Sequence, residues 1–247
     1  MNPHIIEVKG LNVSYDKKNV LTNVYLHIEA GHAYGIIGPN GAGKSTLFKA
    51  ILGLVEPSHG SVTVYGGKIE NARKKVAYIP QKDLFDQDFP ATVFDIVLMG
   101  RYPHKKIFQK INDEDRQKAS EAMKAMQIEN LGQRQIGQLS GGQQQRVYIA
   151  RALCQEAEIF FLDEPFAGVD AMTEESIVTI MHTLKAQGKT FLLVHHDLTT
   201  VQQYFDKIIL INQRLIGFGD TEKLFTQQNL SLCYGSQLSI LHKIQQL

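Results

Sequence analysis

The chain lacks the features that mark disulfide-rich, zinc-binding and strongly charged proteins. It has only two cysteines in 247 residues, Cys154 and Cys233, and they form no CxxC pair. This argues against a disulfide framework or a structural zinc site and fits a reducing compartment. We expect both to be packed small side chains rather than reactive thiols. With 26 Lys and Arg against 25 Asp and Glu, the net charge is +1, so no overall field favours nucleic acid or an acidic membrane surface.

Long hydrophobic runs are also missing. The longest apolar runs, such as residues 159–162 and 191–194, have the length of a strand and fall far below the roughly 20 residues that cross a bilayer. The N-terminus has no basic segment followed by an apolar core, which argues against a signal peptide. We therefore expect a soluble protein, held by a partner at any membrane where it works.

The hydrophobic patterns that are present indicate an α/β protein. Apolar and polar residues alternate over residues 6–28, which predicts antiparallel strands. Residues 159–163 and 190–194 are almost continuously apolar, as in a parallel sheet covered on both faces. Before them, residues from about 82 to 150 show helical spacing and a helix start after Thr92, and predict a small helical lobe.

The most informative motif is a glycine-rich loop at residues 38–46, called the phosphate loop below. Its members are Gly38, Pro39, Asn40, Gly41, Ala42, Gly43, Lys44, Ser45 and Thr46. They fit G-x-x-x-x-G-K-[ST] and lie between a predicted strand, 33–37, and a predicted helix, 45–52. Backbone N–H groups and the helix dipole can then bind phosphate, with Lys44 on the terminal phosphates and Ser45 on Mg²⁺. A glycine-rich turn that fits by chance is the alternative, which the agreement of strand, loop and helix disfavours.

Two carboxylates close the apolar strand 159–162. Asp163 and Glu164 follow it directly, so Asp163 is expected near the nucleotide's metal and Glu164 is expected to polarise an attacking water. The alternative is an acidic turn after a buried strand.

A second candidate anion site lies at Leu139-Ser-Gly-Gly-Gln-Gln-Gln-Arg146. Ser140 can cap the helix that follows, and Gly141 and Gly142 leave backbone N–H groups exposed at its start. A Ser-Gly-Gly cap that binds no ligand is the alternative.

With these motifs the chain resembles the ATP-binding-cassette ATPases over nearly its whole length, and residues 139–143 resemble the signature motif of that family. The resemblance implies a P-loop NTPase fold with a RecA-like parallel-sheet core, an antiparallel β subdomain and an inserted helical subdomain. It places the core in about 1–81 and 151–228, the helical subdomain in about 82–150 and a tail without an assigned role in 229–247, all within one domain, 1–247.

The resemblance also implies a head-to-tail homodimer with two ATP molecules at its interface. Each ATP would contact the phosphate loop of one chain and the signature residues of the other: Ser140, Gly141, Gly142 and Gln143. Asp170 resembles the D-loop aspartate, and Tyr15 resembles the aromatic residue that stacks on adenine. An ordinary strand tyrosine is the alternative for Tyr15.

Two further residues resemble catalytic positions of the family. Gln81 follows Pro80 and resembles the Q-loop glutamine that reaches Mg²⁺ and water, although a lone glutamine is more often a solvated loop residue. His196 lies directly before Asp197, as the switch histidine that contacts the γ-phosphate does. The adjacent His195 is expected to be structural, because strand alternation would place the two side chains on opposite faces.

Departures within the family indicate the transported substrate. The segment 164–170, Glu-Pro-Phe-Ala-Gly-Val-Asp, resembles transition-metal importers, and Met99-Gly-Arg-Tyr-Pro-His104 resembles metal and iron-chelate importers. His104 is not expected to bind metal, because no second ligand lies at metal spacing. Residues 91–104 are expected to dock on the membrane subunit; the alternative is a loop that only covers the core of the lobe.

The sequence thus predicts an ATPase that powers import of a divalent transition metal, with manganese first and zinc, iron or an iron chelate as alternatives. Its expected cofactors are ATP and Mg²⁺. The expected partners are a second copy of the chain, an integral membrane permease and an extracellular or periplasmic metal-binding protein, with no nucleic acid. We expect it at the cytoplasmic face of the membrane. A soluble cassette protein acting on nucleic acid or ribosomes, a non-hydrolysing regulator and an exporter remain alternatives.

Overall fold

The structure is a computed structural model that describes residues 4–16, 18–81, 90–106 and 108–235. The chain divides into two compact units, Met1–Ala72 with Thr190–Leu247, and Arg73–Lys189. We call them the first and the second unit. The predicted boundaries at 82–150 and 229–247 remain a prediction, and 82–89 and 236–247 lie outside the described residues.

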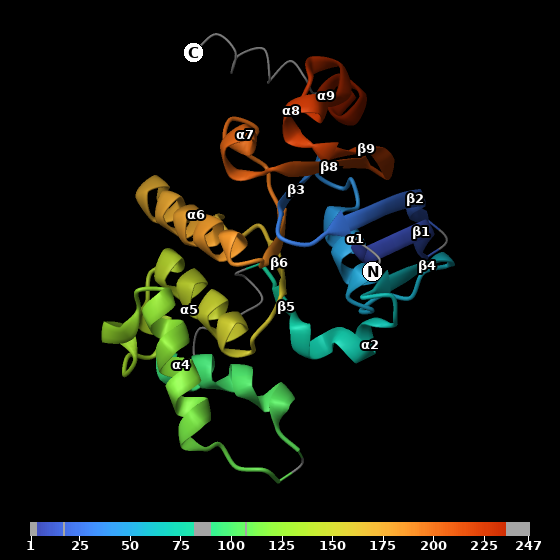
Figure 1. The fold of residues 1–247 in the computed structure, drawn as a ribbon. Coiled ribbons are helices and arrows are strands. Elements are labelled where there is room, and N and C mark those ends of the chain that lie inside the picture. Colours follow the sequence, from blue (N-terminus) through green and yellow to red (C-terminus); the bar gives the residue numbers. More distant parts are fainter. Residues whose placement is uncertain (1–3, 17, 82–89, 107, 236–247) are drawn as a thin grey trace. The chain divides into compact units, whose positions relative to one another are not determined.

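The first unit begins with a three-stranded antiparallel sheet in the order β2-β1-β4. Its strands are β1 (His4–Tyr15), β2 (Lys18–Glu29) and β4 (His59–Val64). The predicted alternation is confirmed on β2, where Val24, Leu26 and Ile28 are buried and the residues between them are more exposed. One face of this sheet packs on the core, and α1 (Lys44–Ile51) contacts all three strands (Figure 1).

A second group of strands in the first unit carries the phosphate loop. In the order β7-β3-β8-β9, they are β7 (Thr190–Val194), β3 (Ala33–Ile37), β8 (Lys207–Asn212) and β9 (Arg214–Asp220). β3 is parallel to both of its neighbours, and β9 returns antiparallel to β8. Every residue of β3 and β7 is buried, which explains their continuous apolar sequence.

Short helices complete the first unit: α2 (Ile69–Ala72), α7 (Val201–Tyr204), α8 (Thr221–Leu224) and α9 (Gln227–Tyr234). The sequence signals from Asn229 onward are too weak to predict α9. The helix is capped by Thr226, whose hydroxyl accepts from Asn229 N at 3.3 Å, and it buries only Leu230 and Cys233. Two buried positions in eight residues leave a periodicity too short to detect. Cys233 is buried as expected, and burial raises its thiol pKa to about 11.

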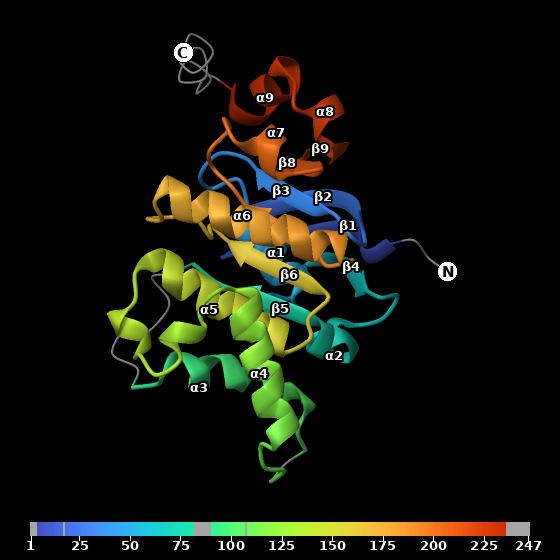
Figure 2. The same cartoon turned by 60° about the vertical axis from the view of Figure 1, so that its left-hand side comes forward.

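The second unit combines a parallel strand pair with helices. The pair is β5 (Val76–Ile79) and β6 (Ile159–Asp163). The helices are η1 (Arg73–Lys75), α3 (Val93–Leu98), η3 (Met99–His104), α4 (Asp113–Ala125), η4 (Glu129–Leu131), η5 (Ile136–Gln138), α5 (Gly141–Cys154) and α6 (Ala171–Ala186). In Figure 2, α3, α4 and α5 pack together. Together the two units confirm the predicted α/β class.

Side-chain caps explain where the helices of the second unit begin. α3, α4 and α5 each start with a reciprocal capping box, formed by Thr92 with Asp95, Asn112 with Asp115, and Ser140 with Gln143. Each box satisfies two backbone N–H groups that a helix start would otherwise leave unpaired. Among the described residues, no helix has the length and apolar character to cross a membrane.

Candidate nucleotide site

The phosphate loop joins β3 to α1, as its sequence predicts. Its glycines are required by space and by backbone geometry: Gly43 has φ +93°, and a Cβ on Gly38 would lie 2.1 Å from the carbonyl oxygen of Ile211. α1 starts at Lys44, one residue before the predicted start. The backbone therefore curls tightly just before a helix N-terminus, the arrangement that directs amide N–H groups at an anion.

Lys44 is held against the loop that it would serve. Its side chain is buried, and Nζ donates to the carbonyl oxygens of Gly38 at 2.8 Å and Pro39 at 2.9 Å. A buried ammonium is kept charged by such charge-assisted hydrogen bonds. The cation is thus fixed at the loop itself, where the oxygens of a bound phosphate could join its coordination.

His196 lies at the same sheet edge as the phosphate loop. β3 and β7 are adjacent and parallel, so the loop after β3 and the histidines after β7 leave the sheet at the same edge. His196 is exposed there, whereas His195 is 4% exposed. The two side chains thus differ in burial, as expected if they point to opposite faces. β7 itself ends at Val194, so both histidines lie just beyond the strand.

His195 is built into the core. Its Nε2 lies 2.7 Å from the hydroxyl of Thr200, and its ring packs on Phe205 with centroids 5.2 Å apart. Burial lowers the pKa of His195 to about 4. A neutral, packed imidazole fits the predicted structural role and leaves His196 as the exposed histidine of the pair.

The second unit brings together two of the predicted catalytic residues. Gln81 follows β5 and Glu164 follows β6, two paired parallel strands, and Gln81 Nε2 donates to Glu164 Oε2 at 3.1 Å. Glu164 has φ +51°, a left-handed conformation that is uncommon for glutamate and typical of constrained functional positions. Asp163 is buried at the end of β6. Burial, and then the Asp163 carboxylate, raise the pKa of Tyr78 to about 12.

The signature residues form the start of α5 and pack on the start of α6. Ser140 Oγ accepts from Gln143 N at 3.3 Å, and Gln143 Oε1 accepts from Ser140 N at 3.0 Å. A Cβ on Gly142 would lie 2.1 Å from Cγ2 of Thr173, whose N and Oγ1 both bond to Asp170. Asp170 therefore caps α6 directly against the predicted second anion site. Tyr15 ends β1 and is 42% exposed; its stacking role remains a prediction.

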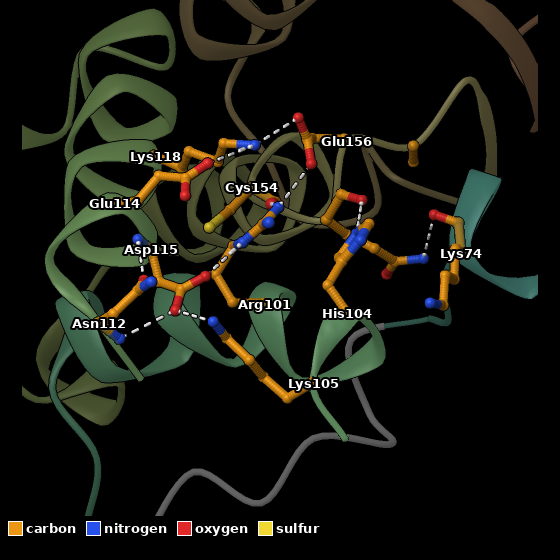
Figure 3. A network of polar contacts seen from close by, with 12 residues as sticks. Lys74, Arg101, His104, Lys105, Asn112, Glu114, Asp115, Lys118, Cys154 and Glu156 are labelled. Atoms are coloured by element: carbon orange, nitrogen blue, oxygen red, sulfur yellow. Dashed lines mark hydrogen bonds and ion pairs between the residues drawn. The ribbon is translucent and has the colours of Figure 1, made fainter. Parts of the chain in front are cut away.

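Sequence reasoning missed a buried ionic network in the second unit (Figure 3). Arg101, 5% exposed, donates to Asp115 at 3.1 Å, to Glu156 at 2.8 Å and to the carbonyl of Cys154 at 2.8 Å. Lys105 also pairs with Asp115. Arg101 and Glu156 are 55 positions apart. The local hydrophobic and charge patterns of a sequence do not predict contacts between residues so widely spaced.

His104 belongs to the same surroundings. Its Nε2 lies 2.8 Å from the carbonyl oxygen of Gln155, which can only accept, so this nitrogen carries the proton and is not available to a metal. In Figure 3, His104 and Arg101 both point from η3 toward the C-terminal end of α5. The predicted docking segment 91–104 is thereby fixed to the helix that begins at the signature residues.

Comparison with known proteins assigns the family. A model of the family described as ABC transporter matches residues 21–167, more than half of the chain. The chain therefore belongs to the ABC transporter family, as the motifs predicted, and it is the ATP-binding component that such systems contain.

The individual relatives are close and cover the chain almost completely. The manganese transport system ATP-binding protein MntB of Bacillus subtilis is 49% identical and covers 96% of this chain and 94% of its own. The zinc transport system ATP-binding protein TroB of Treponema pallidum is 47% identical, covering 96% and 89%. A solved metal-chelate type ABC transporter in an inward-facing conformation has a TM-score of 0.84 at 29% identity, covering 94% and 88%. The predicted fold class is confirmed.

Proposed function

We propose that this chain hydrolyses ATP to drive import of a divalent transition metal, with manganese ahead of zinc and iron. The observation that carries the ATPase is the shared edge of β3 and β7, from which the phosphate loop with its buried Lys44 and the exposed His196 both leave the sheet. The names of the relatives support metal as the substrate: one belongs to a manganese system and another to a zinc system.

The residues of the site suit a nucleotide and its magnesium. The donors that would hold Mg²⁺ are the hydroxyl of Ser45, the amide oxygen of Gln81 and the carboxylate of Asp163, all hard oxygen ligands of the kind that Mg²⁺ prefers. When bound, the ion neutralises charge on the β- and γ-phosphate oxygens. No ligand of this set is a soft sulfur or an imidazole, so the donor chemistry fits.

The remaining steps fall to the protein's own groups. Lys44 and the loop amides bind the phosphates and oppose the charge that develops on the γ-phosphoryl group. Glu164, oriented by Gln81 at 3.1 Å, accepts a proton from the attacking water, and His196 contacts the γ-phosphate. The adenine stacks on Tyr15.

We further propose that two copies of the chain enclose two ATP molecules. Each phosphate loop would face the signature residues of the other copy, and Asp170 would approach the same interface. A permease in the membrane would dock on residues 91–104 and hold the dimer at the cytoplasmic face, and a metal-binding protein outside would deliver the cargo. Hydrolysis removes the bridging γ-phosphate and lets the copies separate.

Phosphate release by the purified chain, wild type against Glu164→Gln, tests the enzymatic proposal. The variant should lose at least about a hundredfold in turnover, the order of a missing general base, and should still bind ATP. Glu175→Gln, an exposed carboxylate on α6, is the matched control and should retain wild-type turnover. Wild-type turnover in Glu164→Gln would refute the assignment, and no turnover in the wild type would favour a non-hydrolysing regulator.

Reconstitution tests the cargo. With permease and metal-binding protein in vesicles, ATPase stimulation should follow loading of the binding protein with Mn²⁺ more strongly than with Zn²⁺ or Fe²⁺. A reversed order would reassign the metal, and movement of metal out of the ATP-accessible compartment would indicate export. Stimulation by DNA or RNA instead would point to the nucleic-acid alternative.

A further inference from the structure

Two histidines and a glutamate gather on one face of the antiparallel sheet in the first unit. His27 and Glu29 are two residues apart on β2, and His4 on β1 is paired with Glu29. Because side chains two apart point to the same face and paired residues share a face, all three lie together. The intervening Ile28 is fully buried, so the cluster occupies the face turned away from that part of the core.

The donor atoms of this cluster are close enough to share an ion. One nitrogen from each histidine and one carboxylate oxygen of Glu29 all lie within 4.8 Å of one another. Ligands about 2.0–2.2 Å from a tetrahedral zinc lie about 3.3–3.6 Å apart, so the most widely separated donors must approach by at most about 1.5 Å, which side-chain rotation can supply. The two imidazoles are already adjacent, with centroids 3.8 Å apart and planes at 27°.

Neighbouring residues fix the positions of these ligands. Phe218 of β9 meets the ring of His27 edge-on, with centroids 4.9 Å apart. Lys207 of β8 holds Glu29 at 3.1 Å and also pairs with Asp220 at 3.3 Å. If a metal ion bound Glu29, Lys207 would still have Asp220 as its partner. Metal binding would therefore not leave the Lys207 ammonium without a counter-ion.

We propose that His4, His27 and Glu29 form a binding site for a zinc-class divalent cation, separate from the nucleotide's magnesium. Two imidazoles and one carboxylate are a ligand set that zinc accepts with water as a fourth ligand. Nothing in this inference depends on ATP hydrolysis or on metal import, because it rests on the cluster alone.

The ligand chemistry sets the order of metals. Imidazole suits zinc and cobalt, and the general affinity order of divalent metals places Mn²⁺ below Co²⁺ and Zn²⁺. Mg²⁺ prefers oxygen ligands and keeps its waters. The site should therefore take Zn²⁺ or Co²⁺ in the presence of excess Mg²⁺ and should discriminate against Mn²⁺.

Metal binding should also stabilise the sheet that carries it. His4 belongs to β1, whereas His27 and Glu29 belong to β2, so one ion would join the two strands. A ligand that binds the folded chain alone raises the unfolding temperature as its concentration exceeds its dissociation constant. This gives a readout that is independent of catalysis.

The tag-free full chain is first stripped of metal with EDTA, which is then removed. It is titrated with Zn²⁺ as the probe, against a background of excess Mg²⁺ and ADP. Calorimetry measures the binding, and thermal unfolding measures the stabilisation. Co²⁺ absorption serves as a second probe of the ligand set. We expect saturable binding, and we expect His27→Ala or His4→Ala to weaken the affinity at least about tenfold. Loss of a residue that only supports a metal ligand already costs about tenfold, so loss of a ligand itself should cost no less. His59→Gln, at the exposed start of β4, is the matched histidine control and should bind as the wild type does.

Lys207→Gln separates this site from adventitious binding. Removing the cation frees Glu29, so the variant should bind Zn²⁺ more tightly than the wild type even though its metal-free form is less stable. Unchanged affinity in both histidine variants, weaker binding in Lys207→Gln, or Mn²⁺ affinity equal to that for Zn²⁺ would overturn the site. Phosphate release by the same preparations reports the ATPase separately, so failure of either proposal can be recognised.

Discussion

Arg101→Met should destabilise the second unit by about 3 kcal/mol, because it removes the central cation of the buried network. Arg101 and Asp115 are 5% and 2% exposed, and removing one partner of a buried ion pair costs about 3–5 kcal/mol. Lys105 and the backbone N–H of Asn112 remain on Asp115, so the lower end of that range applies. Methionine keeps most of the side-chain volume, so the loss reports the charge rather than a cavity.

The control for this prediction lies in the same network. Lys118 pairs with Glu156 at 2.8 Å, but their side chains are 28% and 50% exposed, and exposed pairs contribute about 0–1 kcal/mol. Lys118→Met should therefore cost less than about 1 kcal/mol.

Urea unfolding, with hydrogen exchange to assign the loss to the second unit, measures both variants, because a chain of two units need not unfold in one step. Equal stability losses in Arg101→Met and Lys118→Met would refute the burial argument, as would a loss below about 1 kcal/mol in Arg101→Met.

Three further predictions follow from the contacts of single residues. Gly38→Ala should abolish ATP binding, because its Cβ would lie 2.1 Å from the backbone oxygen of Ile211; equilibrium binding of a fluorescent ATP analogue measures this, and retained affinity would contradict it. Gly142→Ala should lower ATPase activity by displacing α6, and Thr173→Ala in the same chain should restore part of it, since the obstructing atom is Cγ2 of Thr173; no recovery would contradict the steric explanation. Stability should fall as the pH drops from 6.5 toward 4, because burial lowers the pKa of His195 from its ordinary value of 6.5 to about 4 in the folded chain, and the unfolded chain therefore takes up the proton first. Thermal unfolding measured against pH should show a flatter profile over this range for His195→Gln, and an unchanged slope would contradict the prediction.

The sequence predicted the local elements of the site well, because each has a short-range cause. The glycine requirement of the phosphate loop, the apolar run before Asp163 and the helix cap at Ser140 all arise within a few residues. Gly142 is an exception in part: its exposed N–H was predicted, but the close approach of Thr173 that forbids a side chain there was not.

What the sequence could not predict depends on contacts between distant positions. The bond between Gln81 and Glu164 joins residues 83 positions apart, and the network around Arg101 draws its members from η3, α4 and the residues after α5. His104 illustrates the same limit: its spacing argued against a metal site, but only the structure supplies the carbonyl of Gln155 as its partner. Pairing across strands likewise created the cluster of His4, His27 and Glu29.

A crystal structure of the Glu164→Gln variant with ATP and Mg²⁺ would show whether two copies of the chain share each nucleotide. We predict two copies of the chain enclosing two ATP molecules, with each γ-phosphate contacted by Lys44 of one copy and by the Ser140 segment of the other. ATP bound by Lys44 in a single copy, with Ser140 of every copy remote from phosphate, would contradict it.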